Sequence, residues 1–263
     1  MLINIGGWLT DPTHWTGPNG IPTRVLEHLL YAGISLLFSA VIAIPLGIVV
    51  GHSGRAKWTI SIANSLRAVP SLGLLFAVAL WLGPKIASSL AYVIPSVIVL
   101  VLLAVPPILS GTYAGIQGVD PAARDAAQGM GMRGGEVLRK VELPCALPLL
   151  LSGIRGATLQ VIATATIAAS ISLGGLGRYV IDGLSVSDYA EMASGAILVA
   201  LLALAMDGIL ALVQRFAVSP GLSGKFRNTP GNHPVVSTTA RGDAATEPAS
   251  PTDRADDQRE ALV

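Results

Sequence analysis

Five long apolar segments alternate with shorter polar segments along the chain. They lie near residues 26–50, 60–82, 87–109, 146–171 and 192–216. The apolar core of a bilayer is about 30 Å thick, and an α-helix crosses it in about 20 residues. Each segment reaches that length. The pattern therefore predicts an all-α membrane protein with five transmembrane helices.

Prolines interrupt the second and third of these segments. Pro70 falls within the second, Pro95 lies early in the third, and Pro106 and Pro107 stand near its end. Proline has no backbone N–H and its ring clashes with the preceding turn, so it kinks or ends a helix. We expect a kink in both helices, and we expect the third helix to end at Pro106 and Pro107.

Composition supports the membrane prediction. Hydrophobic residues make up 52% of the chain and charged residues 13%, whereas charged residues make up about 25% of a typical soluble domain. The net charge of +1 gives no reason to expect a nucleic-acid partner. Cys145 is the only cysteine, which excludes an internal disulfide or a cysteine metal cluster.

The polar ends divide the chain into three expected parts. These are an external N-terminal tail (1–23), a transmembrane domain (24–217) and a cytoplasmic C-terminal tail (218–263). The first part has no basic start and is broken by prolines, so we do not expect a signal peptide. The last part is rich in Pro, Gly, Ser, Thr and alternating charges, and it lacks the apolar surface needed to offset its ordering entropy. We expect residues 228–263 to be disordered.

A polar stretch, residues 120–144, separates the third and fourth apolar segments. Asp120 can cap a helix that begins at Pro121, where the missing N–H of proline costs nothing. Glycines from Gly129 onward lower the helix propensity, so we expect about two turns. Small side chains on such a helix allow the backbone of another protein to come close. Docking to a partner and an ordinary amphipathic loop helix are both consistent with this composition.

A second short helix is predicted over residues 136–143. Glu136 and Lys140 stand four positions apart, a spacing at which opposite charges stabilise a helix. Pro144 is expected to end this helix, because the residue before a proline is disfavoured in the α conformation.

Seven residues of this stretch form a spaced pattern: Asp125, Ala126, Ala127, Gly131, Val141, Leu143 and Pro144. The pattern resembles the EAA loop of ABC importer permeases, which reads Glu-Ala-Ala, three residues, Gly, nine residues, Ile-x-Leu-Pro. Asp125 replaces the glutamate and Val141 replaces the isoleucine. The resemblance implies a type I ABC importer permease fold. In that fold, the loop at 119–144 is a cytoplasmic coupling helix that sits in a groove of a separate ATPase subunit.

Four stretches of sequence extend the resemblance. They read RAVPSLGLL (67–75), PPILSGTYAGIQGVDPAARDAAQGMGM (106–132), KVELPCALPLLLSGIRGAT (140–158) and ATATIAASISLGGLGRYVIDGL (163–184). Together they are similar to the permease subunit of glycine betaine, carnitine and choline importers, the osmoprotectant branch, over about residues 26–216. The resemblance implies ATP-driven import of glycine betaine, choline, carnitine or a proline-type solute across the bacterial inner membrane.

The resemblance also implies partners and a mechanism. An ABC ATPase subunit would bind ATP and Mg, so neither a bound cofactor nor enzymatic activity is expected on this chain. A second permease chain, identical or paralogous, would complete the translocation pathway. An extracellular solute-binding protein would deliver the small-molecule solute. ATP binding would close the ATPase pair, move the two coupling helices together and turn the pathway from inward-facing to outward-facing.

Basic residues indicate the orientation in the membrane. If the coupling loop lies inside, the inner segments hold Arg55, Lys57, Arg124, Arg133, Arg139, Lys140, Arg215, Lys225 and Arg227. The outer segments then hold Arg24, Lys85 and Arg178. Short cytoplasmic loops carry an excess of Lys and Arg. The distribution therefore predicts an external N-terminus and a cytoplasmic C-terminus.

Ionisable residues inside the apolar segments are costly and often functional. At 1.5 Å per residue, Arg67, Arg155 and Asp207 lie roughly 12 to 17 Å from the inner ends of their segments. One hypothesis is an ion pair between Asp207 and either arginine. The alternative is that the arginines extend toward the cytoplasm independently. Glu27 lies near the outer end of its segment and is expected to be solvated.

Small and hydroxyl residues are concentrated in and after the fourth apolar segment. The candidates for a pathway or gate are Thr164, Thr166, Ser170, Gly174, Gly175 and Gly177. Hydroxyl groups can line a polar path, but small residues also permit close helix packing. The three glycines permit tight backbone turns at the external mouth. Both interpretations remain open at the sequence level.

No catalytic arrangement is predicted. The four histidines are scattered, with no ligand spacing that would support a metal site or a catalytic triad. The sequence also has no GxxxxGK[ST] phosphate loop, so a partner must hydrolyse any ATP that is used.

Other functional classes remain as alternatives to osmoprotectant import. An ABC importer permease for another small solute, such as an amino acid, would show the same coupling loop. An ion-gradient-driven secondary transporter would need intramembrane acids or broken-helix ion sites, often in inverted repeats. A membrane scaffold without transport activity would leave the coupling-loop pattern as a coincidence.

Overall fold

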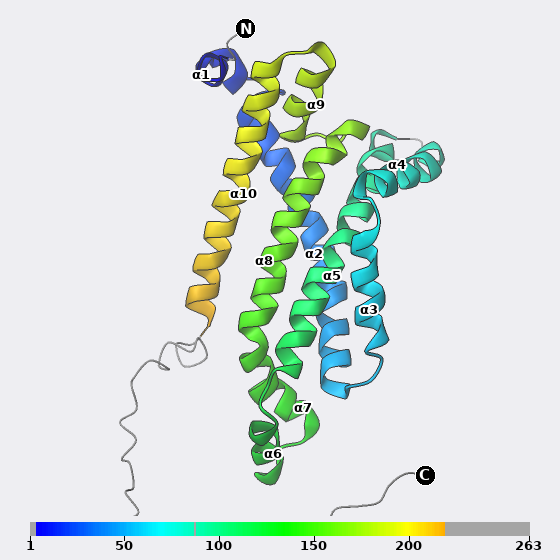
Figure 1. Ribbon diagram of the computed structural model, residues 1–263, viewed down its shortest axis with the longest axis vertical. Coiled ribbons are helices and arrows are strands. Elements are labelled where there is room, and N and C mark those ends of the chain that lie inside the picture. Colours follow the sequence, from blue (N-terminus) through cyan, green and yellow to red (C-terminus); the bar gives the residue numbers. More distant parts are fainter. Residues whose placement is uncertain (1–3, 87, 219–263) are drawn as a thin grey trace, which may run out of the picture. The chain divides into compact units, whose positions relative to one another are not determined.

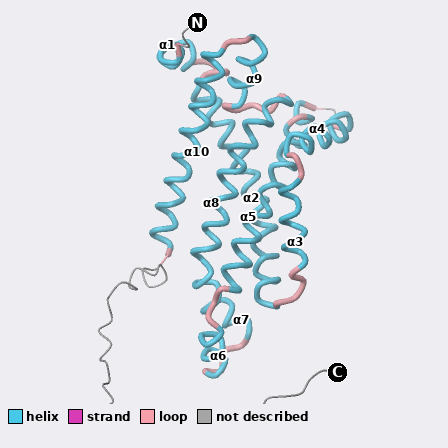
Figure 2. Tube along the Cα trace, in the orientation of Figure 1, coloured by secondary structure: helices cyan, strands magenta, loops and turns pink. Residues whose placement is uncertain are grey.

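The protein, analysed as a computed structural model, is described over residues 4–86 and 88–218. All regular secondary structure in these ranges is helical (Figures 1 and 2). The α-helices are α1 (Ile5–Thr10), α2 (Ile21–Ser53), α3 (Trp58–Ser65), α4 (Ser71–Leu82), α5 (Val93–Gln117), α6 (Pro121–Gly129), α7 (Gly134–Val137), α8 (Leu143–Ala168), α9 (Gly177–Val186) and α10 (Tyr189–Ala217). The segment predicted to be disordered, 228–263, lies outside the described residues.

Short helical turns connect several of these elements. The 3-10 turns are η1 (Pro12–Trp15), η2 (Leu66–Ala68), η3 (Gly83–Lys85), η4 (Ser89–Ala91) and η6 (Ala169–Ile171), and the π segment is Leu138–Glu142. Among the described residues, four helical stretches are long and apolar enough to cross a membrane: α2, α5, α10 and the stretch Gly134–Ile171 that contains α8. A fifth span results if α3 and α4 are counted together. The all-α membrane fold class is therefore confirmed.

The second predicted span is not one straight helix. The stretches Trp58–Ala68 and Ser71–Lys85 meet at an angle of 91°. Val69, between them, has an extended backbone with φ −74° and ψ 127°, as expected for a residue that precedes a proline. Pro70 therefore produces a break rather than a mild kink, and it serves as the N-cap residue of α4.

The third span differs from its prediction at both ends. Residues 83–91 contain two 3-10 turns, and α5 begins only at Val93. It then continues through Pro106 and Pro107 to Gln117, so the predicted end at these prolines was wrong. Both prolines are buried in α5. Packing against neighbouring helices compensates for lost backbone bonds in membrane helices, and it overrides the local preference of proline here.

Helices α2, α5 and α8 pack side by side and form the core (Figure 1). The buried side chains between them are mainly small and aliphatic, and they include Ala43, Val99, Leu103, Ala104, Ala157 and Val161. α5 and α8 approach each other closely. A Cβ added to Gly111 would lie 2.8 Å from the Cα atom of Gly153, so the two backbones are in direct contact. Small residues at helix crossings permit this packing in membrane proteins.

Two short helical elements, α1 and η1, precede α2. α1 contacts α10, and the Trp8 ring stacks on His14 with 4.0 Å between ring centroids. Trp8 also makes an edge contact with Tyr179 of α9. α2 begins at Ile21, slightly before the boundary expected at residue 24.

Two groups of elements lie at opposite ends of α8 (Figure 1). The α6 end comprises α6, α7, the π segment and the last turns of α2 and α5. The α9 end comprises α1, η1, the first turns of α2, the loop at 172–176 and α9. The predicted coupling-loop residues lie at the α6 end, and the predicted glycines lie at the α9 end.

Candidate functional site

α6 forms as its sequence predicts. The Oδ1 atom of Asp120 accepts a hydrogen bond from the Ala122 N–H at 2.9 Å, and Pro121 occupies the first helical position. This N-cap prediction is confirmed. Of the residues in α6, only Ala127 is buried, at 1% exposure, while Asp125 and Ala126 are exposed. The helix therefore packs one small side chain inward and presents its acidic and alanine face outward.

Gly131 lies just after the end of α6. Its φ angle is +86°, in the left-handed region that disfavours side chains. A Cβ at this position would meet no atom within 4 Å, so the backbone conformation, and not lack of space, favours glycine. The N–H of Met132 then reaches back to the carbonyl of Ala127 at 3.1 Å. This bond closes the end of α6.

The predicted helix at 136–143 does not end at Pro144. Instead, α7 continues through the π segment directly into α8, and Pro144 lies in the first turn of α8. The N–H of Leu143 bonds to the carbonyl of Leu138, a π-type spacing. Since proline has no N–H, it fits where the hydrogen-bond register changes. The coupling-loop candidates Val141, Leu143 and Pro144 are therefore part of a continuous helical path, whereas Glu136 and Lys140 pair at 3.5 Å as predicted.

Glu142 is a polar residue of this region that the sequence analysis missed. Only 2% of it is exposed. Its Oε1 atom lies 3.0 Å from the Nε atom of Arg124, and its Oε2 atom lies 2.7 Å from the Nδ1 atom of His52. His52 is 90 positions away in sequence, so no local pattern could predict the contact. A single acid between hydrophobic residues at the start of an apolar segment was the available signal.

Further contacts tie the α6 end together. The Arg124 guanidinium also donates to the carbonyl of Ile116 near the end of α5. The Gln117 side chain donates to the carbonyl of Gly51 in α2 at 2.6 Å. Ends of helices carry carbonyls without intrahelical partners, and such side chains satisfy some of them. The last turns of α2 and α5 are thus joined to each other and to α6.

Two of the three charged residues predicted inside the apolar segments form an ion pair. Arg155 of α8 and Asp207 of α10 form an ion pair through two guanidinium nitrogens and both carboxylate oxygens. Arg67 lies in η2, beside the break between α3 and α4. It takes part in none of the ion pairs among the described residues. The structure therefore brings two of the three candidates together and leaves the third apart.

The hydroxyl candidates bond mainly to their own helix. Thr164 donates to the carbonyl of Gln160 at 2.8 Å, and Thr166 donates to the carbonyl of Ile162 at 3.1 Å. Thr164 is buried, while Thr166 and Ser170 are half-buried. Hydroxyl groups in helices often bond to the preceding turn in this way. These bonds use the threonine donors within α8 and are consistent with close packing.

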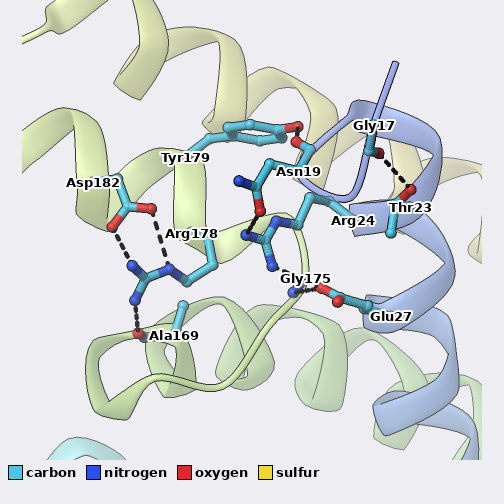
Figure 3. A network of polar contacts seen from close by, with 10 residues as sticks. All are labelled: Gly17, Asn19, Thr23, Arg24, Glu27, Ala169, Gly175, Arg178, Tyr179 and Asp182. Carbon is cyan, nitrogen blue, oxygen red and sulfur yellow. Dashed lines mark hydrogen bonds and ion pairs between the residues drawn. The ribbon is translucent and has the colours of Figure 1, made fainter. Parts of the chain in front are cut away.

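The glycine loop after α8 is held by side chains of α2 (Figure 3). The Gly175 N–H donates to Glu27 Oε2 at 2.8 Å, and Arg24 binds the same oxygen at 2.9 Å. The expectation that Glu27 is simply solvated was wrong, because this backbone donor and Arg24 both engage it. A Cβ on Gly174 would lie 2.5 Å from Glu27 Oε2, and Gly175 has a φ angle of +94°. A side chain at position 174 would therefore displace the Glu27 carboxylate, and the backbone conformation at position 175 favours glycine.

α9 completes the network at this end (Figure 3). Arg178 pairs with Asp182 within α9 and donates to the carbonyl of Ala169 at 3.4 Å. The Tyr179 hydroxyl donates to the carbonyl of Asn19 at 2.6 Å, and burial raises the pKa of its phenol. A Cβ on Gly177 would lie 2.8 Å from the Cα atom of Thr166. The N-terminal segment, α2, the glycine loop and α9 are therefore interlocked.

Metal-binding geometry is absent from the described ranges, 4–86 and 88–218. In them, no group of three or more His, Cys, Asp or Glu side chains is placed to hold a metal ion.

Sequence comparisons give matches over most of the chain. The family model described as "Binding-protein-dependent transport system inner membrane component" matches residues 43–218. The glycine betaine/carnitine/choline transport system permease protein OpuCB of Bacillus subtilis is 34% identical over 201 residues, which cover 75% of this chain and 88% of the relative. The osmoprotectant import permease protein OsmW of Salmonella typhimurium is 31% identical over 215 residues, covering 81% and 99%.

Solved structures show the same fold. An inward-facing structure of the MetNI methionine ABC transporter contains a chain that matches with a TM-score of 0.68 at 21% identity, covering 80% of this chain and 100% of that one. A chain of an amino acid ABC transporter structure with histidines gives a TM-score of 0.64 at 18% identity, covering 82% and 100%.

Proposed function

We propose that this chain, which belongs to the family of binding-protein-dependent transport system inner membrane components, is the permease of an ATP-driven osmoprotectant importer. The solute would be glycine betaine, choline, carnitine or a proline-type compound. The observation that carries the proposal is the similarity over most of the chain to permeases named for these solutes. The coupling-loop pattern supports the ATP-driven mechanism.

α6 would be the coupling helix. Its exposed face carries Asp125 and Ala126, and its ends are fixed by the Asp120 cap and by Gly131. A short helix with small exposed side chains can enter a groove of another protein closely. A separate ABC ATPase would bind this face and would carry the ATP and Mg, since the chain has no phosphate-loop sequence. No cofactor is assigned to this chain.

The proposed orientation in the bacterial inner membrane places the N-terminus outside and the C-terminus in the cytoplasm. The excess of Lys and Arg on the α6 side supports it. The α6 end would then face the ATPase. The α9 end would face the extracellular solute-binding protein that delivers the solute.

A second permease chain, identical or paralogous, would complete the pathway. Many apolar side chains remain exposed on the long helices, including Leu201, Leu204 and Phe216 of α10. Such surfaces in a membrane protein face lipid or another subunit. Thr164, Thr166, Ser170 and the three glycines remain candidates for the pathway or gate. ATP binding would bring the two coupling helices together and open the pathway outward.

Two alternatives are less well supported. The first alternative is an ABC importer permease for another small solute, because the fold neighbours are named for methionine and amino acids. The break between α3 and α4 is the one feature that favours a secondary transporter, because such transporters build ion sites from broken helices. However, the one acid side chain predicted deep in the membrane, Asp207, is already paired with Arg155.

Reconstitution tests the proposal directly. The permease, its ATPase and its binding protein are assembled in vesicles with ATP enclosed, and uptake of labelled glycine betaine is measured. Competition with choline, carnitine and methionine then identifies the solute class. We expect uptake that requires ATP and that the quaternary ammonium solutes inhibit. Inhibition by methionine alone would overturn the solute, and uptake driven by a proton or sodium gradient without ATP would overturn the importer class.

A further inference from the structure

Glu142 is a buried carboxylate at the junction between the π segment and α8. Its side chain is only 3% exposed. Burial of a carboxylate is costly unless charged partners and hydrogen bonds compensate for the lost hydration. Here two potential cations surround it, Arg124 at 3.0 Å and His52 at 2.7 Å. The position of Glu142 is therefore determined by its partners as much as by its own helix.

The two partners come from different parts of the chain. Arg124 belongs to α6, next to Asp125 on the proposed ATPase-binding face. His52 belongs to the last turn of α2. Glu142 itself directly precedes α8. One carboxylate thus contacts α6 and α2 from the start of α8, which places three elements around a single side chain.

Apolar packing alone holds α6 weakly. Ala127 is its single buried side chain, and burial of one methyl group contributes only about 1 kcal/mol. A helix held by so little apolar surface would move relative to α8 when a partner pulled on it. The contact between Arg124 and Glu142 supplies a link in which both side chains are largely removed from solvent, with side-chain exposures of 24% and 3%.

We propose that Glu142 is the positioning residue that joins the coupling helix α6 to α8 and α2, so that displacement of α6 is passed to both long helices. The inference rests on the proposed function, because it takes the ATPase to be the source of that displacement. The π segment supports the proposal, since π turns inside helices occur frequently at functional sites. Neither Arg124, Glu142 nor His52 belongs to the seven-residue coupling pattern.

Two potential cations contact Glu142, and a second, exposed ion pair lies nearby in sequence. Arg124 faces it from α6 and His52 from α2, whereas the Glu136–Lys140 pair lies on the exposed side of α7 and the π segment. Glu142→Gln keeps the size of the side chain and removes its charge. Glu136→Gln makes the same chemical change at an exposed site, 48% open, and serves as the matched control. Arg124→Lys keeps the cation and tests rescue, while Arg124→Gln removes it.

The first measurement does not depend on transport. Amide hydrogen exchange is measured across residues 121–129 in the full-length permease in lipid nanodiscs. We expect exchange in Glu142→Gln and Arg124→Gln to be about tenfold faster than in the unmodified protein, a factor typical of coupling free energies. Glu136→Gln should leave it unchanged. Unchanged exchange in Glu142→Gln would overturn the inference. This outcome is independent of the proposed solute and importer class, because the measurement requires no transport.

The second measurement separates transmission from folding. In vesicles with the ATPase and binding protein, solute uptake and ATP hydrolysis are measured together, and ATPase copurification is quantified. We expect Glu142→Gln to bind the ATPase normally but to lower uptake per ATP hydrolysed about tenfold. Arg124→Lys should retain most of the uptake. The inference would be overturned if uptake fell only in proportion to the loss of protein from the membrane, while the uptake per ATP hydrolysed stayed unchanged.

Discussion

At the α6 end one carboxylate joins neighbouring elements through side chains, whereas at the α9 end another carboxylate also accepts a hydrogen bond from a backbone N–H. Glu142 meets Arg124 and His52. By contrast, Glu27 binds the N–H of Gly175, and Tyr179 binds the carbonyl of Asn19. A contact between flexible side chains can persist while the elements shift slightly. A contact to a backbone group fixes the chain path itself.

Glycine has a different purpose at Gly131 and at Gly177. Gly131, at the α6 end, has open space around its Cα atom, and its positive φ angle favours glycine. Gly177, at the α9 end, lies so close to backbone atoms of Thr166 that a Cβ would overlap them. The first position is therefore constrained by conformation and the second by packing.

Changes on the accessible face of α6 should have the largest effect on transport. Replacing both Asp125 and Ala126 with Lys places two long cations on the proposed ATPase contact. Gly131→Trp places a bulky side chain in the left-handed region. We expect either variant to abolish ATP-driven uptake while the protein remains in the membrane, as measured by vesicle uptake and by quantifying the inserted protein.

A glycine at the other end provides the matched control. Gly6 of α1 also has open space around it, but it has no positive φ angle. Gly6→Trp should leave uptake close to that of the unmodified protein. A variant with both lysines that still transports and still copurifies with its ATPase would contradict the assignment of α6 as the coupling helix.

A Cβ at Gly177 should mainly affect stability. It would lie 2.8 Å from the Thr166 Cα atom, and backbone atoms cannot rotate away. We expect Gly177→Ala to lower the free energy of unfolding by about 1–3 kcal/mol, as overpacking does, and thermal denaturation of the purified protein measures it. Gly33→Ala, in α2 with nothing within 4 Å, should be neutral or slightly stabilising. Equal melting temperatures for both variants would show that the α9 end is not tightly packed.

The ion pair between Arg155 and Asp207 lies between the two ends and should have a moderate effect. Removal of one partner leaves the other charge without its counterion. Because both side chains are partly exposed, we expect Arg155→Gln or Asp207→Asn to lower uptake about threefold. Arg67→Gln, which removes no ion pair among the described residues, is the comparison. If both Asp207→Asn and Arg155→Gln were neutral for folding and uptake, the pair would have no role.

The smallest effect is expected for Tyr179→Phe. It removes the hydrogen bond to the Asn19 carbonyl, which contributes about 0.5–1.5 kcal/mol. Burial raises the pKa of this phenol, so the donor is present at neutral pH and is lost only as the pH rises through that raised pKa. Faster hydrogen exchange around α1 and η1 in the variant is the measurement. Unchanged exchange would mean that the other contacts of this segment, including those of Trp8 and the bond between Arg24 and Asn19, hold it without the Tyr179 hydroxyl.

Local signals in the sequence predicted much of the fold. The places of the long helices α2, α8 and α10 followed from the apolar segments, and the Asp120 cap followed from residue type at a helix start. Pro70 predicted an interruption, but the 91° angle depends on how α3 and α4 pack and has no local signal. The prediction that the third helix ends at Pro106 and Pro107 was wrong, because tertiary packing keeps α5 continuous through both prolines.

The candidate site was less predictable because its key contacts are long-range. The pairing of Glu142 with His52 spans 90 positions, and periodicity carries no information at that separation. Glu142 also occupies the variable position of the coupling pattern, between Val141 and Leu143, so pattern matching passes over it. The continuity of α7, the π segment and α8 depends on a shift in hydrogen-bond register that residue preferences do not encode.

The backbone contact between Gly111 and Gly153 limits which parts of the subunit can rearrange. Helices that touch through their main chains have no intervening side chains to change rotamer, so we expect α5 and α8 to move together during a transport cycle. Optical probes attached to these two helices would then report a constant separation throughout turnover. We then expect the change in shape that exposes a solute to one side of the membrane and then the other to occur at the surfaces of this helix pair.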